Sequence, residues 1–283
     1  SEFEIIIIND GSTDKSVTTL NDIDDKRITL YTTKNKGVSH ARNYGVSKST
    51  SDLIAFLDAD DLWETNHLEN LYSLNESFPN CGLYATAYYK RFFNGKKINT
   101  YFNGVSTDHF GIIDDYFLAS TMDSIAWTSA VMIPKKTFND LGGFDEDMQS
   151  GEDTDLWIRI ALNKSIAFSA VASSNKIFLE SKYHLSYSTT LIVQLKLFQK
   201  FKHLESNNFS FKKYMDLNRF SVALKRKVTG DVFTYKILKK EIDPLNLNTK
   251  QIILLNTPSI MIRLFKQFQF LLLRFNMYLT PFK

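Results

Sequence analysis

The residues best suited to chemistry lie in the stretch Asp58-Ala59-Asp60-Asp61. Asp58 and Asp60 follow the apolar run at 53–57, which is predicted to be a strand, so alternation would point both to one side. Carboxylates this close repel each other and favour a hard cation such as Mg²⁺ or Mn²⁺, which completes its shell with phosphate oxygens and water. The pair therefore predicts a metal-bound diphosphate, with a solvated turn as the alternative.

Three further charged groups suit ligand binding or proton transfer. Asp10 ends an apolar run at 3–8 and could accept the N–H of a uracil or thymine ring, or cap a helix. Arg42 lies on a predicted helix and could hold phosphate through two hydrogen bonds, or form an exposed salt bridge. Glu152 and Asp153 begin an amphipathic segment, where a carboxylate could act as general base toward an acceptor hydroxyl or merely favour a helix N-terminus.

The hydrophobic pattern of the first 60 residues positions these groups. Apolar runs predict buried strands at 3–8 and 53–57, a short strand is expected at 27–31, and helices are expected between them at 15–20 and 38–47. This alternating order indicates an α/β fold with a mostly parallel sheet flanked by helices. Because ligands bind at the carboxyl ends of the strands in such sheets, we expect both aspartate clusters at one edge.

The remaining predicted elements are less regular. The pattern predicts helices at 66–75, 135–140 and 151–162, strands at 82–93 and 126–134, and an irregular segment at 99–125. Asn94-Gly95 is a strong hairpin signal. From Thr190 onward the pattern is helical, with breaks expected at Asp243-Pro244 and Thr257-Pro258.

The net charge of +3 conceals a division of the chain. Residues 1–190 carry 17 Lys and Arg against 26 Asp and Glu, whereas residues 191–283 carry 17 against 5. We therefore predict an α/β domain at 1–190 and a basic, mostly helical extension at 191–283. A single cysteine, Cys81, excludes an intramolecular disulfide. No apolar run reaches the length of a membrane span, so we expect a cytoplasmic protein or one bound at the inner face of the cell membrane.

Five blocks are similar, in order, to the successive signatures of family 2 glycosyltransferases. They are IIIINDGSTD at 5–14, NKGVSHARN at 35–43, FLDADD at 56–61, GGFDE at 142–146 and GEDTDLWIR at 151–159. The resemblance covers about residues 1–190. It implies a GT-A fold, a nucleotide-sugar donor, most simply a UDP-sugar, a divalent metal (Mn²⁺ or Mg²⁺) and inversion at the anomeric carbon.

The resemblance also implies roles for the acidic residues. Asp10 would contact the nucleobase, Asp58 would lie near the ribose and first sugar, and Asp60 would bind the metal on the diphosphate. Asp153 would be the catalytic base, and Glu152 would sit beside the acceptor.

Two further roles follow from the same comparison. Arg42 would help to hold the nucleotide, and Trp127 could stack on an acceptor sugar or serve as a core aromatic. One departure from the family is that the chain begins directly at the Asp10 strand, so a first strand–helix unit of roughly 30 residues is expected to be absent.

Residues 258–283 combine aromatic and aliphatic side chains with Arg263, Lys266 and Arg274. Such a segment could lie in a membrane interface, or pack on the catalytic domain or on a second subunit. No nucleic-acid-binding module is apparent, so we expect no nucleic-acid partner.

The sequence thus predicts an inverting, metal-dependent glycosyltransferase that acts on a glycan or lipid-linked acceptor, with cell-surface polysaccharide synthesis as its expected role. The alternatives are a non-catalytic protein that binds nucleotide-sugars or acts as a scaffold, and a nucleotidyltransferase. The last would need a glycine-rich basic loop near its N-terminus, which the sequence does not contain.

Overall fold

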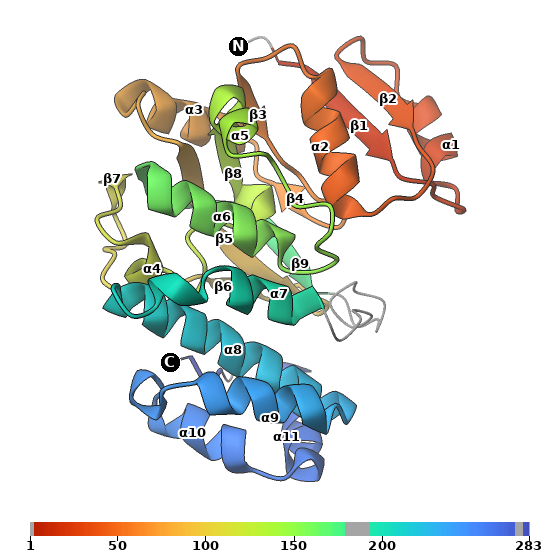
Figure 1. The fold of residues 1–283 in the computed structure, drawn as a ribbon. Coiled ribbons are helices and arrows are strands. Elements are labelled where there is room, and N and C mark those ends of the chain that lie inside the picture. Colours follow the sequence, from red (N-terminus) through yellow and green to blue (C-terminus); the bar gives the residue numbers. More distant parts are fainter. Residues whose placement is uncertain (1–2, 179–192, 275–279, 283) are drawn as a thin grey trace.

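The computed structural model describes residues 3–178, 193–274 and 280–282 (Figure 1). In chain order its α/β part comprises β1 (Ile5–Asn9), α1 (Ser16–Asn21), β2 (Ile28–Thr32), α2 (Val38–Lys48), β3 (Leu53–Ala55), β4 (Leu62–Trp63), α3 (His67–Ser77), β5 (Leu83–Phe92), β6 (Lys97–Asn99), β7 (Phe110–Ile112), α4 (Tyr116–Ala119), the 3₁₀ turn η1 (Thr128–Ala130), β8 (Val131–Pro134), α5 (Lys135–Asp140), α6 (Glu152–Asn163) and β9 (Ile166–Phe178).

The strands form two sheets. β1 and β2 pair in parallel, with Ile5 opposite Ile28, and make a two-stranded sheet of their own. The larger sheet has the order β3-β8-β5-β9-β4, with β6 added to β5 and β7 added to β9. Within the described residues the two sheets share no ladder. The expected absence of a first strand–helix unit stays a prediction.

The α/β class with flanking helices is confirmed, but the larger sheet is mixed rather than mostly parallel. β5 and β9 are parallel, whereas β8 runs antiparallel to both β3 and β5, and β4 runs antiparallel to β9. β3, β5 and β9 therefore share one direction, as helical crossovers require. Between β7 and β8 the chain contains only the four-residue α4 and the turn η1, and β8 enters the sheet between β3 and β5 in the opposite direction.

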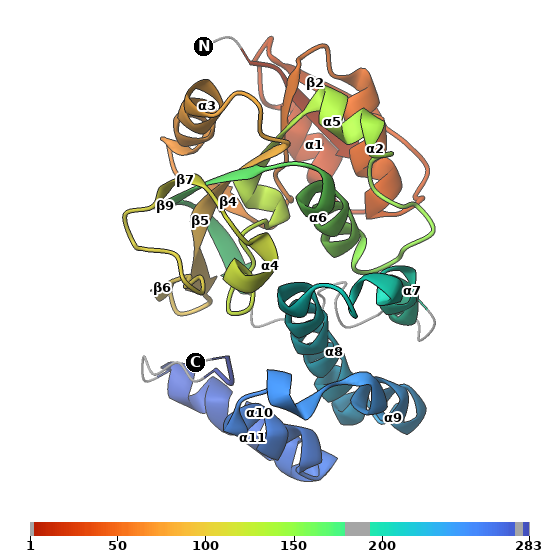
Figure 2. The same ribbon diagram turned by 60° about the vertical axis from the view of Figure 1, so that its left-hand side comes forward.

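Alternating side chains of the sheet pack against different helices. Leu71 and Leu74 of α3 form one cluster with Tyr84 of β5. Leu83 and Ala85, its neighbours in β5, belong to a second cluster with side chains of α6. Because successive residues of a strand face opposite ways, α3 covers one face of the sheet and α6 the other (Figure 2).

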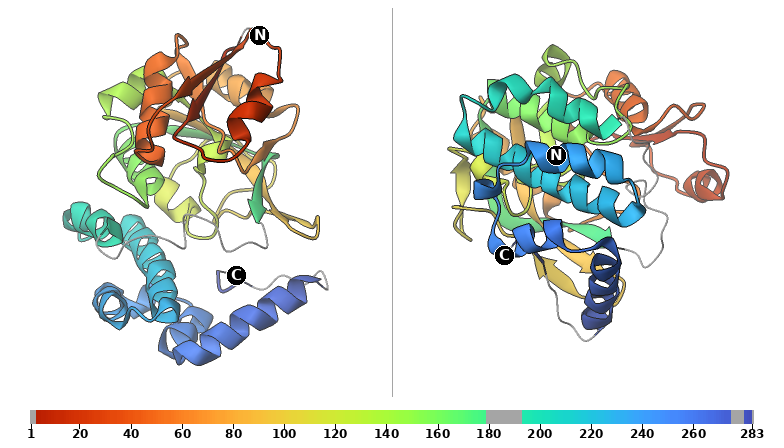
Figure 3. Two further views of the ribbon diagram at one scale, coloured as in Figure 1. Left: turned by 90° about the vertical axis from the view of Figure 1, so that its right-hand side faces the viewer. Right: turned by 60° about the horizontal axis from the view of Figure 1, so that its bottom comes forward.

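The basic extension is helical, as predicted. Its elements are α7 (Val193–Lys200), the turn η3 (Lys202–Leu204), α8 (Phe209–Thr229), α9 (Val232–Glu241), the turn η4 (Pro244–Asn246), α10 (Thr249–Asn256) and α11 (Ser259–Arg274). Helix breaks fall at Asp243-Pro244 and Thr257-Pro258, where proline removes a backbone donor. These helices lie at the end of the molecule opposite β1 and β2 (Figure 3).

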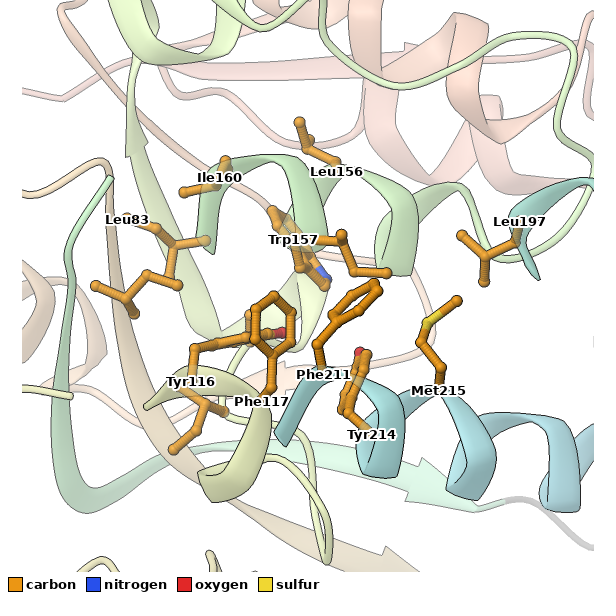
Figure 4. Packing of buried hydrophobic residues seen from close by; sticks show 14 of the residues in the cluster. Leu83, Tyr116, Phe117, Leu156, Trp157, Ile160, Leu197, Phe211, Tyr214 and Met215 are labelled. Carbon is orange, nitrogen blue, oxygen red and sulfur yellow. The ribbon is translucent and has the colours of Figure 1, made fainter. Parts of the chain in front are cut away.

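The extension shares one hydrophobic core with the α/β part. Phe211 of α8 stacks edge-on against Phe117 of α4, with ring centroids 4.8 Å apart, and Tyr214 lies 5.6 Å from the same ring (Figure 4). Trp157 of α6 belongs to the same cluster. The predicted division at 190/191 lies outside the described residues, and the described core is continuous on either side of it.

Three local features of the structure are not given by the sequence pattern. α1 begins at Ser16, whose backbone N–H donates to Asp14 Oδ1 at 3.0 Å, while its N-cap residue, Lys15, makes no side-chain capping bond. The segment 99–125, expected to be irregular, contains β7 and α4. β9 was not predicted, because its run of Ala and Ser has neither strong β propensity nor a clear alternation.

Candidate active site

The aspartate motif lies in a turn rather than on a strand. β3 ends at Ala55, so strand alternation does not place Asp58 and Asp60 on one side as predicted. Asp58 is half-buried and its backbone N–H donates to Ser129 Oγ at 3.0 Å. Asp60 is exposed, and the turn is closed by the Asp61 N–H, which donates to the Asp58 carbonyl at 3.0 Å.

Arg42 joins this turn to α6. Its Nη2 donates to Asp58 Oδ1 at 2.7 Å and its Nη1 to Glu152 Oε1 at 3.0 Å. The guanidinium carbon lies 5.1 Å from the centroid of the Phe144 ring. Burial by itself lowers the pKa of Arg42, but the carboxylates of Asp58 and Glu152 outweigh it and raise that pKa. Arg42 is thus a buried bridge, not the exposed salt bridge that was the alternative.

Glu152 and Asp153 form the first turn of α6, after Gly151 in a left-handed conformation. Burial, together with the charge of Asp153, raises the pKa of Glu152 despite its bond to Arg42. Asp153 Oδ1 accepts from the backbone N–H of Thr154 at 2.6 Å. The predicted contact of Glu152 with an acceptor stays a prediction, since its bonded partner in the structure is Arg42.

Asp10 holds the loop that precedes α2. Its Oδ1 accepts from Thr33 Oγ1 at 3.1 Å and from the Lys36 N–H at 3.0 Å, and its Oδ2 accepts from the Gly37 N–H at 2.8 Å. Gly37 is the N-cap of α2, so the carboxylate fixes the residues at which that helix begins, without bonding the N–H groups of its first turn. Arg42 projects from the same helix, which connects Asp10 to the aspartate turn.

The sequence interpretation missed Asp61, the last residue of the motif. It is buried, its Oδ2 accepts from Ser129 Oγ at 2.7 Å and its Oδ1 accepts from the Ile177 N–H at 3.1 Å. Burial raises the pKa of Asp61 to about 6, and the nearby Asp60 and Asp58 carboxylates add to the effect. Asp61 therefore anchors the turn to β9. The three aspartates at 58, 60 and 61 do not by themselves indicate which one is buried.

Asp153 and Trp127 line one cavity of about 470 Å³. The Trp127 ring packs against Tyr88 at 4.7 Å between centroids, and the Lys176 ammonium lies 5.3 Å from the Trp127 centroid. Other walls come from α8, through Tyr214 and its neighbours, and from residues 280–282. Aromatic rings beside a carboxylate suit the apolar face and the hydroxyl groups of a sugar.

The predicted site residues therefore divide into two groups. Arg42, Asp58 and Glu152 are in direct contact, and Asp153 with Trp127 lines the cavity. Asp10 joins the first group only through α2.

Asp60 is the residue predicted to bind a metal ion, which would need further oxygen or nitrogen ligands. The described residues contain no group of three or more His, Cys, Asp or Glu side chains able to hold a metal ion. One exposed carboxylate beside a second suits a hard ion that keeps phosphate oxygens and water as its other ligands. The residues fit such an ion only as partners of a bound diphosphate.

The resemblance to family 2 glycosyltransferases is confirmed for the first part of the chain. Residues 1–132 match the model of glycosyl transferase family 2. An uncharacterized glycosyltransferase of Rickettsia felis is 35% identical over 171 residues. That match covers 58% of this chain and 26% of the Rickettsia protein, so the chain corresponds to about a quarter of that relative.

Solved structures confirm the GT-A fold. Staphylococcus aureus TarS 1–349, in complex with UDP-GlcNAc, has a TM-score of 0.64 at 14% identity and covers 87% of this chain and 74% of its own. GalNAc-T7 with UDP, GalNAc and Mn²⁺ has a TM-score of 0.53 at 16% identity, covering 69% of this chain and 41% of its own.

Proposed function

We propose that this protein is an inverting glycosyltransferase that moves a sugar from a UDP-sugar to a hydroxyl group of a glycan or lipid-linked acceptor. The observation that carries the proposal is the bridge from Arg42 to Asp58 and Glu152. It holds the aspartate turn against the first turn of α6, so donor-side carboxylates and the predicted base, Asp153, come from neighbouring elements.

The proposed chemistry needs a single base. Asp153 takes the proton of the acceptor hydroxyl, whose oxygen then forms a bond to the anomeric carbon of the donor sugar. The bond from that carbon to the diphosphate oxygen breaks, and the nucleoside diphosphate leaves with the electron pair. Attack from the face opposite the leaving group inverts the configuration. Trp127 would stack on the acceptor and Glu152 would sit beside it.

The donor would be held by Asp10, Arg42, Asp58 and Asp60. Asp10 would accept the N–H of the uracil ring, and Asp58 would lie near the ribose and the sugar. Asp60 would hold Mn²⁺ or Mg²⁺, which when bound neutralises charge on the diphosphate. The solved relatives support this choice, since TarS 1–349 is seen with UDP-GlcNAc and GalNAc-T7 with UDP and Mn²⁺.

The place of action is also proposed. Within the described residues no helix is both long and apolar enough to cross a membrane. We place the protein in the cytoplasm, at the inner face of the cell membrane, in contact with it through residues 258–283. A lipid-linked acceptor in cell-surface polysaccharide synthesis would suit that location.

Calorimetry tests the donor site first. UDP, GDP and dTDP are titrated with and without Mn²⁺ into the wild type, Asp60→Ala and the exposed control Asp147→Ala. We expect Mn²⁺-dependent binding of UDP that only Asp60→Ala loses, because diphosphate and carboxylate share the ion. Absence of nucleotide binding by the folded wild type would contradict the proposal and favour a scaffold role.

The base is tested by turnover. With the donor identified, Asp153→Asn should lower kcat about 10²- to 10⁴-fold, the usual contribution of a general base, while nucleotide affinity stays within about twofold. Asp147→Asn, whose side chain is 90% exposed, is the matched control. Release of the nucleoside diphosphate reports the rate. Equal kcat in both variants would remove Asp153 from the mechanism.

A further inference from the structure

Helix α11 carries an apolar stripe that no other described element covers. Met261, Leu264, Phe265 and Phe268 follow the i, i+3, i+4, i+7 spacing of one helical face, and Ile260 lies one turn before Leu264. All five side chains are between 45% and 68% exposed. Contiguous exposed apolar side chains on a helix mark an interaction surface.

The other side of α11 is fixed to the protein. Ile262 is buried, and the Arg263 guanidinium donates to the Val228 carbonyl at the end of α8, with its Nη2 at 2.7 Å. Because α11 packs on α8 through this side, the helix is held in place and the stripe faces the solvent. α11 lies at the edge of the molecule opposite β1 and β2 (Figure 3).

The sequence that contains the stripe is strongly basic. Residues 244–283 contain no Asp or Glu and five basic residues, Lys250, Arg263, Lys266, Arg274 and Lys283. Lys225 of α8 lies near Arg226 and Lys266. Burial, and then the charges of these two neighbours, lower the pKa of Lys225. A segment that carries net positive charge around an apolar stripe is attracted to an anionic lipid surface.

We propose that α11 docks this protein on an anionic phospholipid bilayer, with Met261, Leu264, Phe265 and Phe268 entering the headgroup–acyl boundary. The nearby lysines and arginines would meet the lipid phosphates. A helix lying in the interface with an apolar face inward and cations beside it is an established mode of membrane binding. This inference rests on the membrane contact proposed above, but its surface lies outside the donor and base residues, so a failure of docking would leave the catalytic proposal standing.

A second copy of the chain is a less suitable occupant. A two-fold interface brings the same patch of both copies together. The acid-free segment 244–283 would then face itself, with like charges juxtaposed around the apolar contact. An anionic bilayer carries charge opposite to that of this segment, whereas a second copy carries the same charge.

Vesicle sedimentation tests the docking. The full chain is mixed with vesicles of phosphatidylcholine alone and with vesicles containing one-third phosphatidylglycerol. Leu264→Glu/Phe268→Glu places two charges on the stripe at exposed positions, which leaves the core intact. The matched control is Phe209→Glu/Val171→Glu, which changes two exposed apolar residues outside α11 and carries the same added charge.

We expect the wild type to bind the anionic vesicles at least tenfold more tightly than the neutral ones, and to lose binding as salt rises. The stripe variant should lose at least tenfold in binding, and the control less than twofold. Absence of wild-type binding, or equal binding by the stripe variant, overturns the proposal. So does a wild-type dimer in lipid-free gel filtration that the stripe variant converts to monomer.

Discussion

At the scale of single residues, Arg42 determines how the charges of the candidate site are balanced. One guanidinium serves two carboxylates, Asp58 and Glu152, and Asp153 follows directly. The four groups together carry an excess of negative charge. Burial, and then the charge of Asp153, raise the pKa of Glu152, and carboxylates this close together favour an added cation. A diphosphate would therefore be repelled here unless a divalent ion accompanied it.

Asp61 makes a pH-dependent contribution to stability. Its folded pKa is about 6, whereas an unfolded aspartate has a pKa of about 3.9. Between these values the folded protein binds a proton that the unfolded chain has released, so the free energy of unfolding falls as pH rises through the window. We expect Asp61 to account for a loss of about 1 kcal/mol between pH 5 and pH 7.5.

The measurement is urea unfolding at both pH values for the wild type and Asp61→Asn. Asparagine keeps an oxygen acceptor for the Ile177 N–H but does not titrate, so the variant should lack this part of the pH dependence. Asp140→Asn removes an exposed carboxylate and should keep the wild-type dependence. Identical pH dependence in all three proteins would contradict the assignment to Asp61.

At the scale of elements, the sequence predicted the helices whose hydrophobic pattern and flanking residues are local. The helix at 38–47 was expected from its pattern and is present as α2 (Val38–Lys48), and that at 151–162 as α6. The 13-residue strand β9 and the antiparallel insertion of β8 depend on tertiary pairing. The contact between Arg42 and Glu152 likewise joins residues 110 positions apart, which no spacing rule reveals.

Gly151 sets the start of α6 and thereby the position of Asp153. Its φ is +83°, a backbone conformation that destabilises an L-residue by about 1–2 kcal/mol. An added Cβ would lie 3.5 Å from the Leu197 side chain, which is an ordinary van der Waals contact. Gly151→Ala should therefore lower the free energy of unfolding by about 1 kcal/mol through backbone strain. Relief of that strain would shift the first turn of α6, so kcat should fall at least fivefold.

Gly104→Ala is the matched control for that effect. Gly104 has a φ of +73° and nothing within 4 Å of an added Cβ, and it lies outside the candidate site. Denaturant unfolding should give similar stability losses for both variants, and only Gly151→Ala should lower the rate of nucleotide release. Equal rates in the two variants would show that Asp153 does not depend on the geometry of this turn.

At the scale of the whole molecule, charge and packing divide the chain differently. The charge asymmetry predicts two units, 1–190 and 191–283, yet Phe117 and Phe211 from either side meet in one buried cluster (Figure 4). Charged side chains mostly face the solvent, whereas the cooperativity of unfolding depends on the buried side chains. We therefore expect the α/β part and the helices to unfold together.

The distribution of tryptophan makes this expectation measurable. Trp63, Trp127 and Trp157 all lie in the α/β part, and residues 191–283 contain none. Phe211→Ala empties a fully buried site in α8 and should cost about 3–5 kcal/mol. Phe209→Ala, at a position 74% exposed on the same helix, is the control and should cost little.

If the chain is one cooperative unit, Phe211→Ala lowers the urea midpoint measured by tryptophan fluorescence and the midpoint measured by helical circular dichroism equally. A shift in circular dichroism alone would instead mean that the helices unfold as a separate domain.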